Sequence, residues 1–130
     1  MSKKEIRKKF RESVFRRDNW TCQVCGDGPY ENLDFFDAHH ITDRSLMPNG
    51  GYVKENGVTV CNNPVGLITK EGEYGLPDFE IDNDSCHLKC EKYHITEGRE
   101  WCEGLHPDDL YKKIGSSKEL AIQKSLELDE

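Results

Sequence analysis

Six cysteines are the side chains of this 130-residue sequence with the clearest chemistry. Cys22 and Cys25 form a CxxC pair, a spacing at which one tight turn brings two thiolates onto a tetrahedral metal ion. A redox pair has the same spacing, but it needs a thioredoxin-like βαβ context that the surrounding pattern does not show. A zinc site needs two further ligands, for which we favour Cys61 and Cys86. Cys90, one helical turn after Cys86, is the alternative fourth ligand.

The adjacent histidines His39 and His40 are the second chemical feature. Neighbouring residues of a strand point to opposite faces, so one imidazole could bind a metal ion while the other does a separate job. His87 follows Cys86 directly and projects at a different angle from the same turn, so it could reach a second metal ion near His39. Glu91, four residues after His87 on the same helix face, is a weaker candidate third ligand.

Two further cysteines and two histidines have an ordinary structural interpretation. A cysteine outside a metal site is most often a small buried hydrophobe, which is our interpretation of Cys102 and, where it is no ligand, of Cys90. A single histidine is usually a surface or packing residue, and we interpret His94 and His106 in this way.

Elements from distant parts of the chain must bring these side chains together. Ile6, Phe10 and Val14, spaced by four residues, predict an amphipathic helix over 3–17. The other predicted elements are a short strand and turn over 20–26, strands over 35–41 and 58–61, and helices over 86–94, 107–113 and 117–128. Suitable N-caps are Asp84 or Ser85 for the helix over 86–94, and Ser116 in a capping box with Glu119 for the last helix.

The net charge of −7 hides a strong asymmetry along the chain. Residues 1–17 carry eight basic and two acidic side chains, a net +6, while residues 18–130 carry a net −13. Attraction to phosphate depends on where Lys and Arg lie, so the helix over 3–17 is either an ordinary solvated helix or a DNA-contacting one. The candidate DNA contacts are Lys4, Arg7, Lys8, Arg11, Arg16 and Arg17.

The composition predicts a location where thiols stay reduced. No apolar run approaches the ~18 residues of a membrane span, and the basic start has no apolar stretch behind it. We therefore expect no membrane association and a cytoplasmic location. In a reducing compartment, metal ligation by cysteines is favoured over disulfide formation.

Four motifs in this order resemble the HNH endonucleases, and they are most similar to the small, zinc-stabilised, phage-type members. The resemblance covers roughly residues 8–94, and the tail over 107–117 is also similar to phage members. If the chain is phage-encoded, its location is the host cytoplasm. The motifs are RRDNWTCQVCG at 16–26, DAHHI at 37–41, ENGVTVC at 55–61 and CHLK at 86–89.

The resemblance implies an α+β protein with a ββα-metal fold, also called the His-Me finger, together with a structural zinc knuckle, a basic N-terminal helix and C-terminal helices. By matching positions, it implies that His40 is the general base and that Asn56 braces the loop and orients this base. It implies that His39 and His87 bind a catalytic Mg²⁺, Mn²⁺ or Ni²⁺. The structural Zn²⁺ ligands by the same matching are Cys22, Cys25, Cys61 and Cys86.

The sequence departs from the family pattern in the second half of the zinc knuckle. Cys61 and Cys86 are far apart, which we interpret as an insertion of an acidic loop over 62–84. Closing a longer loop costs little, so the metal site can survive the insertion, and the loop could bind a protein partner. We thus expect one domain over 1–130, made of the basic helix 1–17, the first knuckle and His-pair hairpin 18–61, the inserted loop 62–84, the metal-binding helix 85–97 and the C-terminal helices 106–130.

The expected function is a metal-dependent DNA endonuclease that nicks or cuts both strands. The alternative is a non-catalytic, zinc-finger-like module that binds nucleic acid or a protein partner on the same scaffold. That alternative explains the cysteines and the basic helix but leaves His39, His40, Asn56 and His87 without a role.

Overall fold

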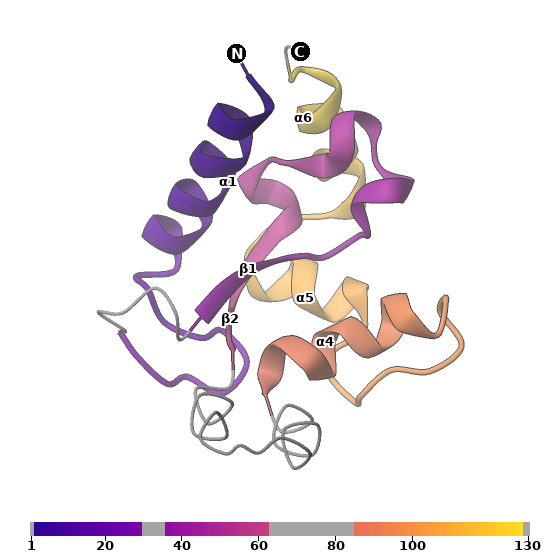
Figure 1. Cartoon of the computed structure of the whole chain (residues 1–130). Helices are drawn as coiled ribbons and strands as arrows, with labels where there is room; N and C mark the ends of the chain where they lie inside the picture. The colour runs from indigo at the N-terminus through magenta and orange to yellow at the C-terminus, as the bar shows by residue number, and fades with distance from the viewer. Residues whose placement is uncertain (1, 30–35, 63–84, 129–130) are drawn as a thin grey trace, which may run out of the picture.

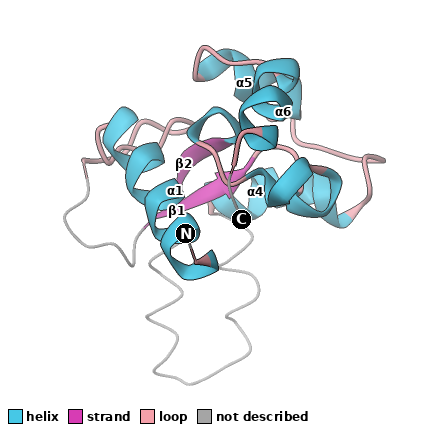
Figure 2. Cartoon of the chain, turned by 90° about the horizontal axis from the view of Figure 1, so that it is seen from above, coloured by secondary structure: helices cyan, strands magenta, loops and turns pink. Residues whose placement is uncertain are grey.

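An antiparallel hairpin with α-helices on both of its faces organises the part of the chain that the computed structural model describes, residues 2–29, 36–62 and 85–128 (Figures 1 and 2). The protein is a small α+β protein with a two-stranded sheet and, among the described residues, four α-helices. The elements in chain order are α1 (Lys3–Arg17), β1 (Phe36–His40), three short 3-10 turns η2 (Arg44–Leu46), η3 (Pro48–Gly51) and η4 (Lys54–Asn56), β2 (Gly57–Cys61), α4 (Cys86–Ile95), α5 (Pro107–Lys113) and α6 (Lys118–Leu126).

The register of the hairpin decides which side chains face which helix. His39 pairs with Val58 and His40 with Gly57, so the two histidines lie on opposite faces. On the α1 face, Phe36 packs with three buried residues of α1, namely Phe10, Val14 and Phe15. On the other face, β2 packs through Val58 and Val60 into a second cluster that includes Cys86, Cys90, Leu110 and Tyr111.

The start of β2 lies directly against α1. A Cβ atom added to Gly57 would lie 2.6 Å from Val14 Cγ2 and 2.7 Å from Phe10 Cε1, closer than packed carbon atoms come. Glycine is therefore needed for this approach. At its N-terminus, α1 is held by a capping box in which Ser2 and Glu5 bond each other's backbone N–H groups.

The predicted helices are confirmed, with small shifts at their ends. Ser85, of the two predicted N-caps, accepts from the N–H of Leu88 and opens α4. The last helix is capped by Ser117 instead of Ser116, because the hydroxyl of Ser116 donates to the backbone carbonyl of Glu55.

Of the short strand and turn predicted over 20–26, the strand is wrong and the turn is confirmed. Asn19 and Trp20 adopt left-handed backbone conformations (φ 57° and 52°), which extended backbone excludes. The chain then folds into a turn in which Gly26 N–H donates to the carbonyl of Cys22. From residue 63 on, the predicted acidic loop over 62–84 lies outside the described residues, as do Phe35 and residues 129–130. Within the described ranges, every helix is too short or too polar to cross a bilayer.

Candidate metal centres

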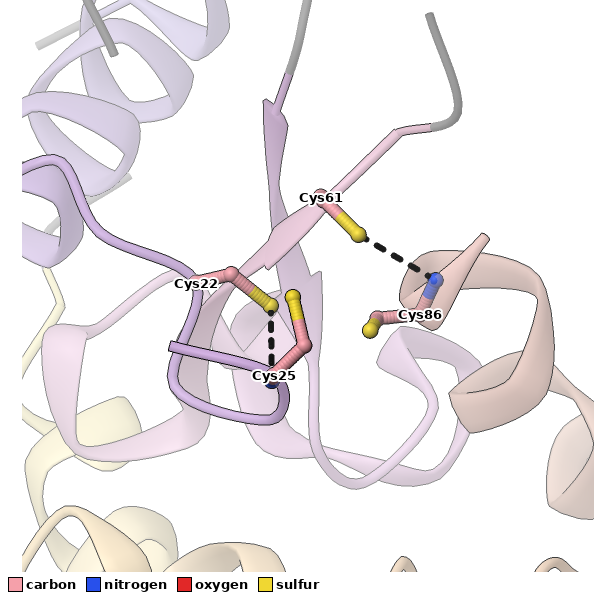
Figure 3. Close-up of side chains that lie close together, drawn as sticks. All are labelled: Cys22, Cys25, Cys61 and Cys86. Carbon is pink, nitrogen blue, oxygen red and sulfur yellow. Dashed lines mark hydrogen bonds between the residues drawn. The ribbon is translucent and has the colours of Figure 1, made fainter. Parts of the chain in front are cut away.

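Four cysteines from three separate segments converge on one point. Cys22 and Cys25 lie in the turn after α1, Cys61 ends β2 and Cys86 begins α4, and their sulfur atoms point toward a common centre (Figure 3). All four sulfurs lie within 4.8 Å of one another. Tetrahedral zinc with Zn–S bonds of ~2.3 Å needs sulfurs ~3.8 Å apart, so only a small inward movement separates the cluster from a metal site. These cysteines could hold a structural metal ion such as zinc.

Backbone N–H groups in the cysteine cluster donate hydrogen bonds that stabilise the thiolate form of the cysteines. Cys25 N–H donates to Cys22 Sγ and Cys86 N–H donates to Cys61 Sγ, each at 3.4 Å (Figure 3). Burial raises the pKa of Cys22, but N–H groups of neighbouring residues outweigh it and lower that pKa below its usual value. Burial, with the neighbouring Cys61 and Cys22, raises the pKa of Cys86 far above the ordinary range. A metal ion would therefore have to displace a proton from Cys86.

Cys90, the alternative fourth ligand, is not one of the four clustered cysteines. Its side chain is 1% exposed and packs in the core beneath α4, where burial raises the pKa of its thiol to about 12. Cys102 packs against the same core. Both positions agree with the interpretation of these residues as small hydrophobes.

A second cluster joins β1 to α4. Nδ1 of His39 lies 3.1 Å from Glu91 Oε2, and Nε2 of His87 lies 3.3 Å from the same oxygen. Metal–ligand bonds of ~2.0–2.2 Å place neighbouring ligand atoms ~3.0–3.5 Å apart, which matches these separations. His39, His87 and Glu91 could therefore hold a metal ion.

Asp37 is a member of this site whose role the sequence interpretation missed. Its Oδ2 lies 3.1 Å from Nδ1 of His87, so the ring turns its Nε2 toward Glu91. Burial lowers the pKa of His87, but the two carboxylates outweigh it and raise the pKa to about 9. The available signal was strand periodicity, which places Asp37 on the same face as His39 two residues later.

His40 occupies the opposite face of β1. Its ring stacks on Phe10 of α1 with centroids 4.6 Å apart, and it meets the ring of Tyr52 edge-on at 4.8 Å. Burial, and then the charges of His39 and Arg44, lowers the pKa of His40 to about 4. Nε2 of His40 and Nε2 of His39 are buried without a hydrogen-bond partner among the described residues.

Asn56 braces the connection between the two strands. Its amide donates to the carbonyls of Thr42 and Gly51, and its Oδ1 accepts from the N–H of Thr42 and the hydroxyl of Tyr111. Its own backbone carbonyl accepts from Ile41, the residue after His40. The buried amide of Asn56 makes four hydrogen bonds, which fix the backbone just after the histidine pair. It can therefore influence the position of His40 only indirectly, through the backbone.

His94 is the other functional candidate that the sequence interpretation missed, since we took it for a surface or packing residue. Its Nε2–H donates to the backbone carbonyl of His40 at 2.9 Å, and its ring stacks on His39 with centroids 5.2 Å apart. Both members of the histidine pair are thus held by one residue of α4. His106, by contrast, caps α5 by accepting from Asp108 N–H, which is a structural role.

Most of the candidate DNA contacts form an exposed basic surface on α1, defined here by Lys4, Arg7, Lys8, Arg11 and Arg16. Arg17 does not belong to this surface. Its guanidinium makes a two-bond ion pair with Asp18 and donates to the carbonyls of Lys54 and Gly57, so its donors are used within the fold.

The two clusters meet at the start of α4. Cys86 and His87 are consecutive residues, yet one faces the cysteine cluster and the other faces His39 and Glu91. The geometry therefore offers one closed, sulfur-lined centre and one mixed centre of imidazole and carboxylate. No family model, curated protein or solved structure matches this chain.

Proposed function

We propose that this chain is a metal-dependent DNA endonuclease of the HNH type, which hydrolyses phosphodiester bonds with His40 as general base. The observation that carries the proposal is the separation of neighbouring histidines. His39 meets His87 and Glu91 on the α4 face of the hairpin, while His40 lies on the α1 face. The element order β1, β2, α4 is also that of a ββα-metal fold.

His40 suits the work of a base. With a pKa of about 4 it is neutral at pH 7, and its Nε2 has no competing partner among the described residues. The rings of Phe10 and Tyr52 fix its orientation. A phosphate anion beside the ring would raise this pKa toward neutrality, where a general base is most effective. In the proposed reaction, the imidazole of His40 takes the proton of the attacking water.

His39, His87 and Glu91 would hold the divalent cation, which we propose to be Mg²⁺, Mn²⁺ or Ni²⁺. When bound, such a cation supplies a Lewis acid for the phosphate and the departing 3′ oxygen. The chain itself orients the donors, because Asp37 turns the ring of His87 toward Glu91 and His94 fixes the backbone of the histidine pair.

The cysteine cluster and the basic surface of α1 have supporting roles in the proposal: the first stabilises the fold and the second binds DNA. We propose that the cysteine cluster holds a structural Zn²⁺ that joins the turn after α1, β2 and α4. The basic surface of α1 would bind the DNA backbone by phosphate neutralisation, independently of sequence.

Incubation of the zinc-loaded full chain with supercoiled plasmid tests the proposal. We expect cleavage that requires added Mg²⁺ or Mn²⁺, and a His40→Ala rate lower by about 10²–10⁴-fold, since this is the usual contribution of a general base. Zinc content and DNA affinity should not change in His40→Ala. The matched control is His106→Asn, which removes an imidazole elsewhere, keeps a capping side chain and should retain full activity.

Two outcomes would contradict the proposal at different levels. Cleavage retained by His40→Ala would remove His40 from the role of base. A plasmid that stays supercoiled with every added cation would favour the alternative, a non-catalytic zinc-binding module that contacts nucleic acid through the basic surface of α1.

A further inference from the structure

A pocket of about 680 Å³ is lined in part by Tyr52, whose ring meets the proposed base His40 edge-on. It lies between the start of α1, the segment after β1 and the end of the described chain, which Figures 1 and 2 show close together. The residues that matter for its chemistry are Lys3, Ile6, Arg7, Arg44, Tyr52 and Leu128. Pockets of this size accept ligands as large as a nucleotide.

The charge of this pocket is opposite to that of the chain. Its lining carries the cations Lys3, Arg7 and Arg44, and the described residues that line it include neither Asp nor Glu. In a protein of net charge −7, three cations around one pocket, with no carboxylate among the described residues that line it, favour the binding of an anion. Ile6 and Leu128 add apolar surface beside these charges, which suits an anion attached to a less polar group.

Tyr52 connects the two guanidinium groups to the proposed base. Arg44 Nη1 donates to the hydroxyl of Tyr52 at 2.8 Å, and Arg7 Cζ lies over the ring of Tyr52 at 5.5 Å from its centroid. The same ring meets His40 edge-on. Gly50 (φ 79°) lets Tyr52 approach the turn, since a Cβ at this position would lie 2.7 Å from Tyr52 Cε2. The two guanidiniums are therefore held at a fixed place relative to His40, as bidentate phosphate recognition requires.

We propose that this pocket is a nucleotide subsite, in which Arg7, Arg44 and Lys3 bind a DNA phosphate next to the scissile one and Ile6 and Leu128 contact its sugar or base. The subsite rests on the proposed nuclease function, because it serves to place the neighbouring phosphodiester beside His40. Arg44 and Tyr52 are new contacts of this kind, outside the basic surface of α1.

Fluorescence anisotropy with a short labelled DNA duplex tests the subsite in the zinc-loaded full chain without added Mg²⁺ or Mn²⁺. Between about 50 and 200 mM salt, the slope of log affinity against log salt should fall by about 0.9 in Arg44→Gln and in Arg7→Gln, one lost phosphate contact each. We expect each variant to bind about tenfold more weakly at the lowest salt. The matched control is Arg99→Gln, which changes an exposed arginine outside the pocket whose Nη1 lies 4.0 Å from Glu97 Oε1.

Tyr52→Phe sharpens the test because it keeps the ring beside His40 and beneath Arg7 but removes the hydroxyl that Arg44 bonds. We expect about threefold weaker binding, and no further loss when Tyr52→Phe is added to Arg44→Gln, since both changes remove the same contact. Unchanged melting temperatures would show that the folded state is retained.

The outcomes separate the subsite from the proposed function. If Arg7→Gln and Arg44→Gln bind DNA like Arg99→Gln, the subsite is wrong, whether or not the wild type cuts plasmid. If the wild type never cuts plasmid but the two variants lose affinity and salt slope, the nuclease is wrong and the DNA site stands. If inorganic phosphate binds to the wild type but not to Arg44→Gln, while the duplex binds equally to both, the pocket is a site for free phosphate and the proposal is overturned.

Discussion

The two candidate metal centres share α4 and the hairpin, yet they differ in the type and the number of their ligands. The cysteine cluster draws four sulfur atoms from three segments. The second cluster has three ligands, and the side chains of His87 and Glu91 keep about a third of their surface exposed (30% and 33%). A closed set of four thiolates suits a structural ion, whereas an incomplete set of nitrogen and oxygen ligands leaves positions open for water and substrate.

The difference shows how one helix start can serve two purposes. Consecutive residues of an α-helix point about 100° apart, so Cys86 and His87 reach different centres from one turn of α4. An ion at the cysteine cluster would therefore fix the place from which His87 projects. We call the four-cysteine cluster the structural centre and the cluster of His39, His87 and Glu91 the open centre. Loss of the structural centre should disturb the open centre, whereas loss of the open centre should leave the structural centre intact. The following changes test this one-way dependence, from the largest expected effect to the smallest.

Replacing Cys22 with Ser should have the largest effect. The variant loses a buried ligand of the structural centre, and binding of structural zinc contributes about 10–16 kcal/mol to the folding of small zinc domains. We expect zinc content to fall from about one ion per chain to near zero and the cooperative thermal transition to be lost. Metal analysis together with circular dichroism measures both. Full zinc content in Cys22→Ser would take Cys22 out of the ligand set.

Replacing His87 with Ala should abolish the open centre alone. One of three ligands is lost while Cys86 is untouched, so we expect the affinity for Mn²⁺ to fall at least about 100-fold, with zinc content and melting temperature close to the wild type. Titration of the zinc-loaded protein, followed by the electron paramagnetic resonance of free Mn²⁺, measures this affinity. His106→Asn is the control and should bind Mn²⁺ like the wild type. Loss of zinc from His87→Ala would show that the two centres depend on each other in both directions.

Local signals were enough to predict the four described helices and the two strands of the hairpin, because caps and periodicity act within a few residues. The start of α5 at Pro107 and the cap of α4 at Ser85 are of this kind. Of the strand and turn predicted over 20–26, only the strand failed, because the backbone conformation of Asn19 and Trp20 redirects the chain before the cysteine turn.

Roles that depend on contacts between distant segments could not be predicted from the sequence. The partner of Asp37 is set by how α4 lies across β1, and the bond from His94 to the carbonyl of His40 depends on the same packing. From the sequence, Arg17 looks like one more basic residue of α1. In the fold, its guanidinium donates hydrogen bonds to backbone carbonyls about 40 residues away. In each case, the side chain's type indicated the chemistry and the tertiary structure decided its use.

The centre formed by His39, His87 and Glu91 should also respond to pH, through the proton on His87. Asp37 and Glu91 raise the pKa of His87 to about 9, so at pH 7 its ring is protonated and a cation must displace a proton. Affinity for Mn²⁺ should therefore rise about tenfold per pH unit from pH 7 and level off near pH 9, as the proton is lost before the metal arrives. Manganese titrations at several pH values measure the slope. An affinity independent of pH over this interval would contradict a protonated His87.

Replacing Cys90 with Ala should have the smallest effect on metal binding and stability. The variant tests whether Cys90 is a core residue beneath α4 or a ligand of the cysteine cluster. Cys90 is buried and lies outside the four clustered cysteines, so its loss removes one sulfur atom from the packing and no metal ligand. We expect zinc content to stay at about one ion per chain and the free energy of unfolding to fall by about 1 kcal/mol, the usual cost of a small core truncation. Cys86→Ala is the matched comparison, with the same atoms removed one helical turn earlier, and it should lose the zinc. If the two variants exchanged these results, Cys90 would be the fourth ligand, and His87 would no longer project from a metal-bound turn.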